Sequence, residues 1–371
     1  MNEDRAVRYH RLRRRAAVIS AALAASALLA LLASGWSAGL AAWTRHAFGG
    51  AVGIAVYTGT LALGWELVSL PIAFYASFLL DRKYGLSSET VGTWAADHLK
   101  AFAVGLVFSL GAAFAVYGSI WLWPDRWWLI TTALFGVVAI VFSFVAPIVL
   151  MPMFYRFAPL QRDALRDRLL ALSTRVGVPV LGVFEWGLGE KTTRANAALV
   201  GMGGTRRILV SDTLLKDYSD DEVEVILAHE LSHHVHHDMW SGLAIETLIV
   251  LAALAAAHGA LVAFASAAGV AGASDVAGLP LLVLAAGAVS LLLTPVANAW
   301  SRHNERRADR YALRLTGRSE PFISAMRRLG AQNLAEEHPS RPAFWFFHTH
   351  PTIEERIAAA RSFITSERAT S

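Results

Sequence analysis

The sequence contains no cysteine, which excludes disulfide bonds and thiolate metal ligands. Charged residues are also scarce, at 17% of the 371 residues, where a soluble domain usually has about 25%. Hydrophobic residues reach 55% and the mean hydropathy is +0.44. A soluble protein could not keep that much apolar surface from water. We therefore expect an integral membrane protein whose surroundings include the lipid bilayer.

The formal net charge of +4 is too small to indicate a nucleic-acid partner. The basic residues cluster beside apolar segments, and six arginines precede the apolar residues 16–34. This segment is long enough for a transmembrane helix, and the arginines place the N-terminus in the cytoplasm. A cleaved signal peptide is the alternative, although the apolar core is long for one.

Glu66 lies inside the second of six apolar segments, where a carboxylate must face protein or water. Functional and structural roles both stay open for it. The first four segments form an N-terminal membrane region, residues 1–150. The six predicted transmembrane helices cover residues 16–34, 51–80, 101–123, 128–151, 243–267 and 279–299.

The composition turns polar between the fourth and fifth spans, at residues 152–239, which predicts a globular domain outside the bilayer. Six crossings from a cytoplasmic N-terminus place this domain and the C-terminal tail in the cytoplasm, where the arginine and lysine content also places them. The domain is predicted to contain an amphipathic helix at 161–176, a strand at 178–186 and a hairpin formed by 195–202 and 206–211.

A predicted helix at residues 220–237 carries the pattern H-E-x-x-H in His229, Glu230 and His233. The histidines stand one turn apart on one face, where two imidazoles can hold one metal ion. Glu230 lies at their flank and can take a proton from a water whose pKa the metal lowers from about 15.7 to about 7. A surface helix that contains two histidines by chance is the alternative, because the motif is short.

A metal site of this kind needs a third ligand, and Glu305, on a predicted helix at residues 300–315, is the best candidate. Two histidines and a glutamate leave a fourth position open for water and substrate. Asp309, one turn later, could accept a hydrogen bond from a ligand histidine. A solvated charged helix is the alternative for this segment. In the predicted hairpin, Asn196 could bond a substrate backbone added as a strand, or be an ordinary turn residue.

The segments HELSH, SRHNERRAD and FHTHPTIEER resemble, in order and spacing, the M48 metallopeptidases, and most closely their Ste24 type, the CAAX prenyl proteases. The resemblance covers about residues 65–360 and leaves the first sixty residues unmatched. It implies a zincin-like α+β peptidase domain at residues 152–371. It also implies one zinc ion per chain, with the general base Glu230 and the ligands His229, His233 and Glu305.

The resemblance extends to further positions around this ligand set. Asn196 matches a substrate-binding asparagine, and His350 matches a histidine that stabilises the tetrahedral intermediate. His348 could compete with His350, because the pattern here is H-x-H-P. The positions that support the site are matched by His237, Arg302 and Asp309.

We therefore predict a mainly α-helical membrane protein, a zinc endopeptidase that cuts a peptide or membrane protein at the cytoplasmic face of a bacterial membrane. The Ala/Arg/Gly-rich composition suggests a bacterium with GC-rich DNA, so a prenylated substrate is not carried over. Eukaryotic Ste24 proteins have seven spans around a water-filled chamber, whereas six are predicted here. A non-catalytic metal-binding scaffold or transporter stays open. An intramembrane site-2 protease is disfavoured, because burying the polar residues around the motif would be costly.

Overall fold

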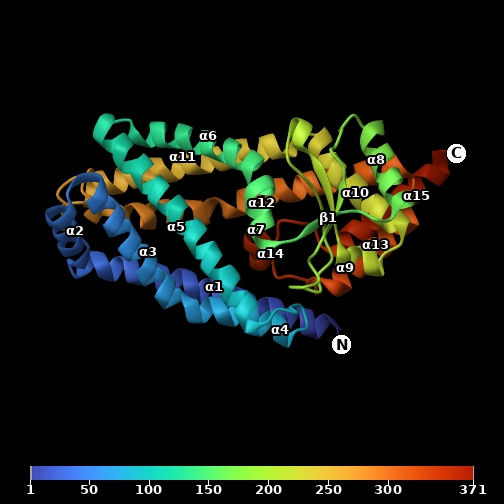
Figure 1. Ribbon diagram of the computed structural model, residues 1–371, viewed down its shortest axis with the longest axis horizontal. Helices are drawn as coiled ribbons and strands as arrows, with labels where there is room; N and C mark the ends of the chain where they lie inside the picture. Colours follow the sequence, from blue (N-terminus) through green and yellow to red (C-terminus); the bar gives the residue numbers. More distant parts are fainter. Residues whose placement is uncertain (1, 371) are drawn as a thin grey trace.

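The computed structural model describes residues 2–370, so the predicted domain ends at residues 1 and 371 lie outside it. The molecule is elongated (Figure 1), with long helices along most of its length and a small sheet at one end. Both ends of the chain lie toward the end that carries the sheet. The arginine-rich start of the first helix is therefore close to the globular domain.

Within residues 2–370, six helices are long and apolar enough to cross a membrane, as predicted. Two of them pass through a short π-helical turn near a proline, Pro71 or Pro147, whose missing N–H interrupts the regular ladder. The spans are built from α1 (Asn2–Ala33), α3 (Gly50–Phe74) with η1 (Tyr75–Leu79) and α4 (Leu80–Lys83), α5 (Val91–Leu122), α6 (Trp127–Val145) with η2 (Ala146–Leu150) and α7 (Met151–Phe154), α11 (Asp238–Phe264), and α12 (Leu279–Thr316).

Several helices continue beyond the apolar residues that are predicted to span the membrane. α1 includes the arginine-rich segment, and α5 begins at Val91, ten residues before the predicted start at 101, with the Thr90 side chain capping it. The predicted span 279–299 and the ligand helix 300–315 form the single helix α12. A short helix, α2 (Trp36–Phe48), was not predicted; it lies between Gly35 and Gly49, whose φ angles are 74° and 68°.

The sheet has the order β1-β2-β4-β3. The predicted hairpin is present, and Leu199 of β3 pairs with Ile208 of β4 in the antiparallel register. β2 is shorter than predicted and runs parallel to β4, and the edge strand β1 was not predicted. The strands are β1 (Phe157–Pro159), β2 (Val183–Trp186), β3 (Ala197–Val200) and β4 (Arg207–Ser211).

Helices pack around this sheet to form the core of the globular domain, in which Leu169, Ile208 and Phe322 are almost fully buried. The predicted amphipathic helix is α8 (Asp163–Arg175). The others are α9 (Asp212–Asp217), α10 (Asp220–Val235), α13 (Ser319–Gln332), α14 (Arg341–Phe347) and α15 (Ile353–Thr370), with a short 3₁₀ turn at η3 (Gly203–Thr205). A second 3₁₀ turn, η4 (Val276–Gly278), lies between α11 and α12 and packs against α2.

The helix that carries the H-E-x-x-H pattern, α10, is fixed at its start and along one face. Ser219 and Glu222 exchange the two hydrogen bonds of a capping box at its start. Val223, Leu227 and Leu231 are buried in the core. Their burial fixes the rotation of the helix, and with it the directions of His229 and His233. α10 ends at Val235, two residues earlier than predicted.

Candidate metal and catalytic site

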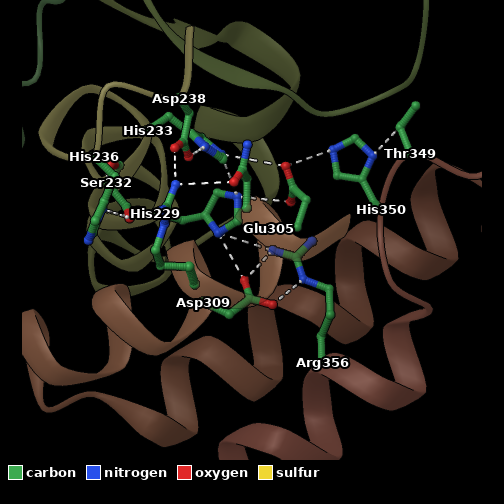
Figure 2. A network of polar contacts seen from close by, with 12 residues as sticks. His229, Ser232, His233, His236, Asp238, Glu305, Asp309, Thr349, His350 and Arg356 are labelled. Carbon is green, nitrogen blue, oxygen red and sulfur yellow. Dashed lines mark hydrogen bonds and ion pairs between the residues drawn. The ribbon is translucent and has the colours of Figure 1, made fainter. Parts of the chain in front are cut away.

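His229, His233 and Glu305 meet between α10 and α12 (Figure 2). Nε2 of His229 lies 3.3 Å from Nε2 of His233 and 3.2 Å from Oε2 of Glu305, and Nε2 of His233 lies 3.5 Å from Oε1 of Glu305. Zinc bonds of about 2.0–2.2 Å in a tetrahedral arrangement separate ligand atoms by about 3.4 Å. The three side chains therefore have the spacing of a zinc ligand set.

The tautomers of the two histidines support the same interpretation. Nδ1 of His229 lies 2.9 Å from Asp309, and Nδ1 of His233 lies 2.9 Å from Asp238. A carboxylate only accepts hydrogen bonds, so both Nδ1 atoms carry the proton and both Nε2 lone pairs face Glu305. Oε2 of Glu305 is buried and has no hydrogen-bond donor among the described residues. Such a group of acceptors repels itself unless a cation lies between them.

The charges around the histidines also favour a cation. Burial opposes a positive charge on His229, but the Asp309 and Glu305 carboxylates outweigh it and raise the pKa of His229 to about 10. Arg356 holds Asp309 in place through two hydrogen bonds of 2.8 and 2.6 Å. The site therefore takes up positive charge, as a proton or as a metal ion.

Glu230 lies beside the ligand set without joining it, on the wall of a cavity of about 1160 Å³. Burial raises the pKa of its carboxyl, although the nearby His229 and His233 act in the opposite direction. A carboxylate with a raised pKa is a stronger base. It has the position and the basicity to take a proton from a water molecule in the cavity.

The structure distinguishes the two histidines of the H-x-H-P segment. Nε2 of His350 lies 3.4 Å from Oε1 of Glu305, and the side chain is exposed to the cavity. His348 also lines the cavity, but its Nε2 faces Glu336, at 3.4 Å. Of the two, His350 is therefore the one placed to contact a reacting substrate.

Asn196 stands at the start of β3, exposed on the cavity wall. Its backbone N–H donates to Oγ of Ser211 and its carbonyl accepts from the Ser211 N–H, each at 3.0 Å. These bonds attach the residue to β4. The neighbouring Ala197 also lines the cavity, so the outer edge of β3 begins on the same cavity as His229 and Glu305.

Arg302 supports the segment that carries His350, because its Nη1 donates to the carbonyls of His348 and Phe344 at 2.6 and 3.2 Å. His237, which the resemblance matches to a position that supports the site, directly precedes α11. It adopts a left-handed conformation, with φ 57°, at the turn into α11. The contact with His233 comes from the next residue, Asp238, which our sequence analysis missed although it follows the motif closely.

Glu66, the carboxylate inside the second span, has a partner on the neighbouring helix. Its Oε1 lies 2.5 Å from Nε2 of His98 on α5, and the His98 ring stacks on Trp94. This pairing satisfies the carboxylate between two spans. It supports the structural role over a transport function.

Comparisons with known proteins cover nearly the whole chain. A family model described as peptidase family M48 matches residues 159–364. A second, described as the N-terminal part of the CAAX prenyl proteases with five membrane helices, matches residues 2–156. The expectation that the first sixty residues lie outside the resemblance is therefore wrong. Before the sheet, this region has five α-helices that are longer than one turn. One of them is α2, which has only 13 residues.

Similar proteins include the uncharacterized metalloprotease YhfN of Bacillus subtilis, 30% identical over 304 residues, which are 81% of this chain and 71% of YhfN. The probable CAAX prenyl protease 1 of Schizosaccharomyces pombe is 25% identical over 82% of this chain, and the match spans 65% of that relative. The crystal structure of S. mikatae Ste24p shares the fold, with a TM-score of 0.87 and 21% identity over 97% of this chain and 89% of that one. The chain belongs to the M48 peptidase family and is a Ste24-like membrane metalloprotease.

Proposed function

We propose that this protein is a zinc-dependent endopeptidase that holds one zinc ion with His229, His233 and Glu305. The observation that carries the proposal is the group of three acceptor side chains, with 3.2 to 3.5 Å between their acceptor atoms, beside Glu230 in a cavity. Zinc bound there would act as a Lewis acid and lower the pKa of the attacking water.

Two side chains carry the proton and charge movements. Glu230 takes a proton from the water and passes it to the leaving amine, a double role that suits a carboxyl whose pKa burial raises. The Thr349 hydroxyl lies 2.8 Å from Nδ1 of His350. When that hydroxyl donates, Nε2 of His350 carries the proton and can donate to the oxyanion that forms on the substrate.

The substrate we propose is an extended segment of a peptide or membrane protein. The cavity of about 1160 Å³ is close in size to pockets for small ligands, about 300–1000 Å³, so a folded domain does not fit. A segment added beside β3 would bond the backbone near Ala197 and the side chain of Asn196. Leu199 lies further along, and its carbonyl already accepts from Nε2 of His234 at 3.0 Å.

Glu230→Gln tests the reaction. We expect the purified variant to keep one zinc ion per chain and to cleave no member of a peptide library read by mass spectrometry. Glu224→Gln is the matched control, since it lies earlier in the same helix and pairs with Arg168 outside the cavity. Cleavage by Glu230→Gln at the wild-type rate would overturn the proposal. Zinc binding without cleavage by the wild type would favour a scaffold.

We further propose that the active site faces the cytoplasm of a bacterium. The connections between spans at the end of the molecule away from the sheet contain two basic residues, Arg45 and Arg126, and such a scarcity of arginine and lysine is typical of the non-cytoplasmic side. Because the chain has no cysteine, single substitutions to cysteine can report the topology. Ser274→Cys, between α11 and α12, should react with an impermeant maleimide on spheroplasts. Ser362→Cys, on α15, should react only after lysis, and the reverse pattern would contradict this orientation.

A further inference from the structure

The arginine-rich start of α1 packs against the peptidase domain (Figure 1), far in sequence from the residues that it contacts. The hydroxyl of Tyr9 donates to Asp81 at 2.6 Å, and Nε2 of His10 lies 2.8 Å from the carbonyl of Leu334. Arg14 forms a two-point ion pair with Glu336, with 3.0 Å between Nη2 and Oε1. This half of α1 is therefore attached to the loop that follows α13.

Glu336 joins α1 to residues 344–350, the segment that carries His348 and His350. Its side chain is 3% exposed, and it lies between Arg14 and His348, whose Nε2 is 3.4 Å away. Burial disfavours the charged form of Glu336, but Arg14 outweighs it and lowers the pKa of this carboxyl. A carboxylate so buried needs its partner, because loss of one member leaves the other charge uncompensated.

The other side of the same segment is held by α12. Arg302 donates to the His348 carbonyl, and Nδ2 of Asn298 donates to the Trp345 carbonyl at 2.9 Å. The segment is thus fixed by its backbone on one side and by the imidazole of His348 on the other. His350 follows two residues later, between this attachment and α15, whose Arg356 is bonded to Asp309 on α12.

The loop that follows α13 also contacts the residues just before β3, the strand at the opposite edge of the sheet from β1. Oδ1 of Asn333 accepts from the Ala195 N–H at 3.2 Å, next to Asn196. Leu334 has a φ of 50°, which is rare for leucine, and its side chain is buried among α1 and the residues near Tyr84. Docking of α1 therefore holds the loop in a conformation that reaches both sides of the cavity.

We propose that Arg14 and Glu336 are positioning residues, which hold His348 and thereby place His350 opposite the metal ligands. The inference rests on the role of His350 in the proposed function. It assigns the cytoplasmic half of α1 to the support of the active site, in addition to its role as a membrane anchor. Both residues also line the cavity, and the proposal gives them no contact with the reacting atoms.

Arg14→Ala tests this role in the full-length, zinc-loaded protein, with the library peptide that the wild type cleaves fastest. We expect kcat to fall roughly 10- to 100-fold, because small displacements of a catalytic group have losses of this order, and KM to stay within about twofold. Hydrogen exchange should become faster in residues 344–352 and stay unchanged in 220–235. Arg15→Ala, an exposed arginine at the next position, is the control and should match the wild type.

Two further variants separate positioning from general folding. Arg14→Lys keeps the charge and should restore part of the kcat, and Arg14→Glu combined with Glu336→Arg should restore slow exchange in residues 344–352. Wild-type kcat and exchange in Arg14→Ala would overturn the inference and leave the proposed function intact. Zinc loss with faster exchange throughout the chain would also overturn it, since the contact would then only stabilise the fold. Absence of cleavage by the wild type would refute the proposed function instead.

Discussion

Asp238 accepts a hydrogen bond from Nδ1 of His233 at 2.9 Å, although the two residues belong to different helices. The left-handed conformation of His237 turns the chain sharply after α10 and brings the first residue of α11 back to the motif. Arg307 pairs with the same carboxylate from α12. The orientation of the His233 ring therefore depends on three helices.

Asp238→Asn should weaken zinc binding roughly 10- to 100-fold, the usual effect of removing a hydrogen-bond partner of a ligand histidine. The amide is uncharged and can present N–H groups to Nδ1, which disfavours the tautomer that exposes the Nε2 lone pair. Competition with a zinc chelator measures the change. Asp163→Asn, where the side chain is 75% exposed, should leave the affinity unchanged. Equal affinities in both variants would show that Asp238 does not orient the ligand.

Glu305→Gln should leave the purified protein with less than one zinc ion per chain, because the only charged member of the ligand set is lost. In the wild type, zinc at 100 times its Kd adds about 2.7 kcal/mol to the free energy of unfolding. A chelator should therefore lower the Tm of the wild type and leave that of Glu305→Gln unchanged. Glu320→Gln, on the surface of α13, should respond to the chelator as the wild type does. A full zinc complement in Glu305→Gln would mean that another residue supplies the third ligand.

His350→Ala should reduce kcat by roughly 10²- to 10³-fold with zinc content unchanged, the usual loss when one oxyanion donor is removed. His348→Ala should have a smaller effect, because His348 faces Glu336 and acts only through position. Steady-state kinetics on one library peptide compare the two. The opposite order of effects would assign the oxyanion contact to His348.

Asn196→Ala should raise KM about 5- to 10-fold and change kcat little, since one hydrogen bond to the substrate backbone contributes about 1 kcal/mol in both the bound and the transition state. Gln161→Ala, an exposed amide near the opposite edge of the sheet, is the control. An unchanged KM in Asn196→Ala would place the substrate elsewhere in the cavity.

The spans and the ligand set were accessible to sequence reasoning for different reasons. A span needs about 20 consecutive apolar residues, which hydropathy detects without knowledge of packing. His229 and His233 lie one turn apart, so their proximity follows from local helix geometry. The start of α5 was missed because polar residues 91–100 continue a helix outside the bilayer, and β1 was missed because three residues carry no periodic pattern.

By itself, the sequence determined that this protein lies in a membrane and carries a helix with two histidines on one face, because both properties depend on neighbouring residues. Only the tertiary structure decided that Asp238 orients His233, that His350 faces the cavity, and that Arg14 contacts Glu336. The last pair is separated by 322 positions. Such contacts depend on how helices pack, and no local pattern of side chains encodes the distance between two surfaces that meet only after folding.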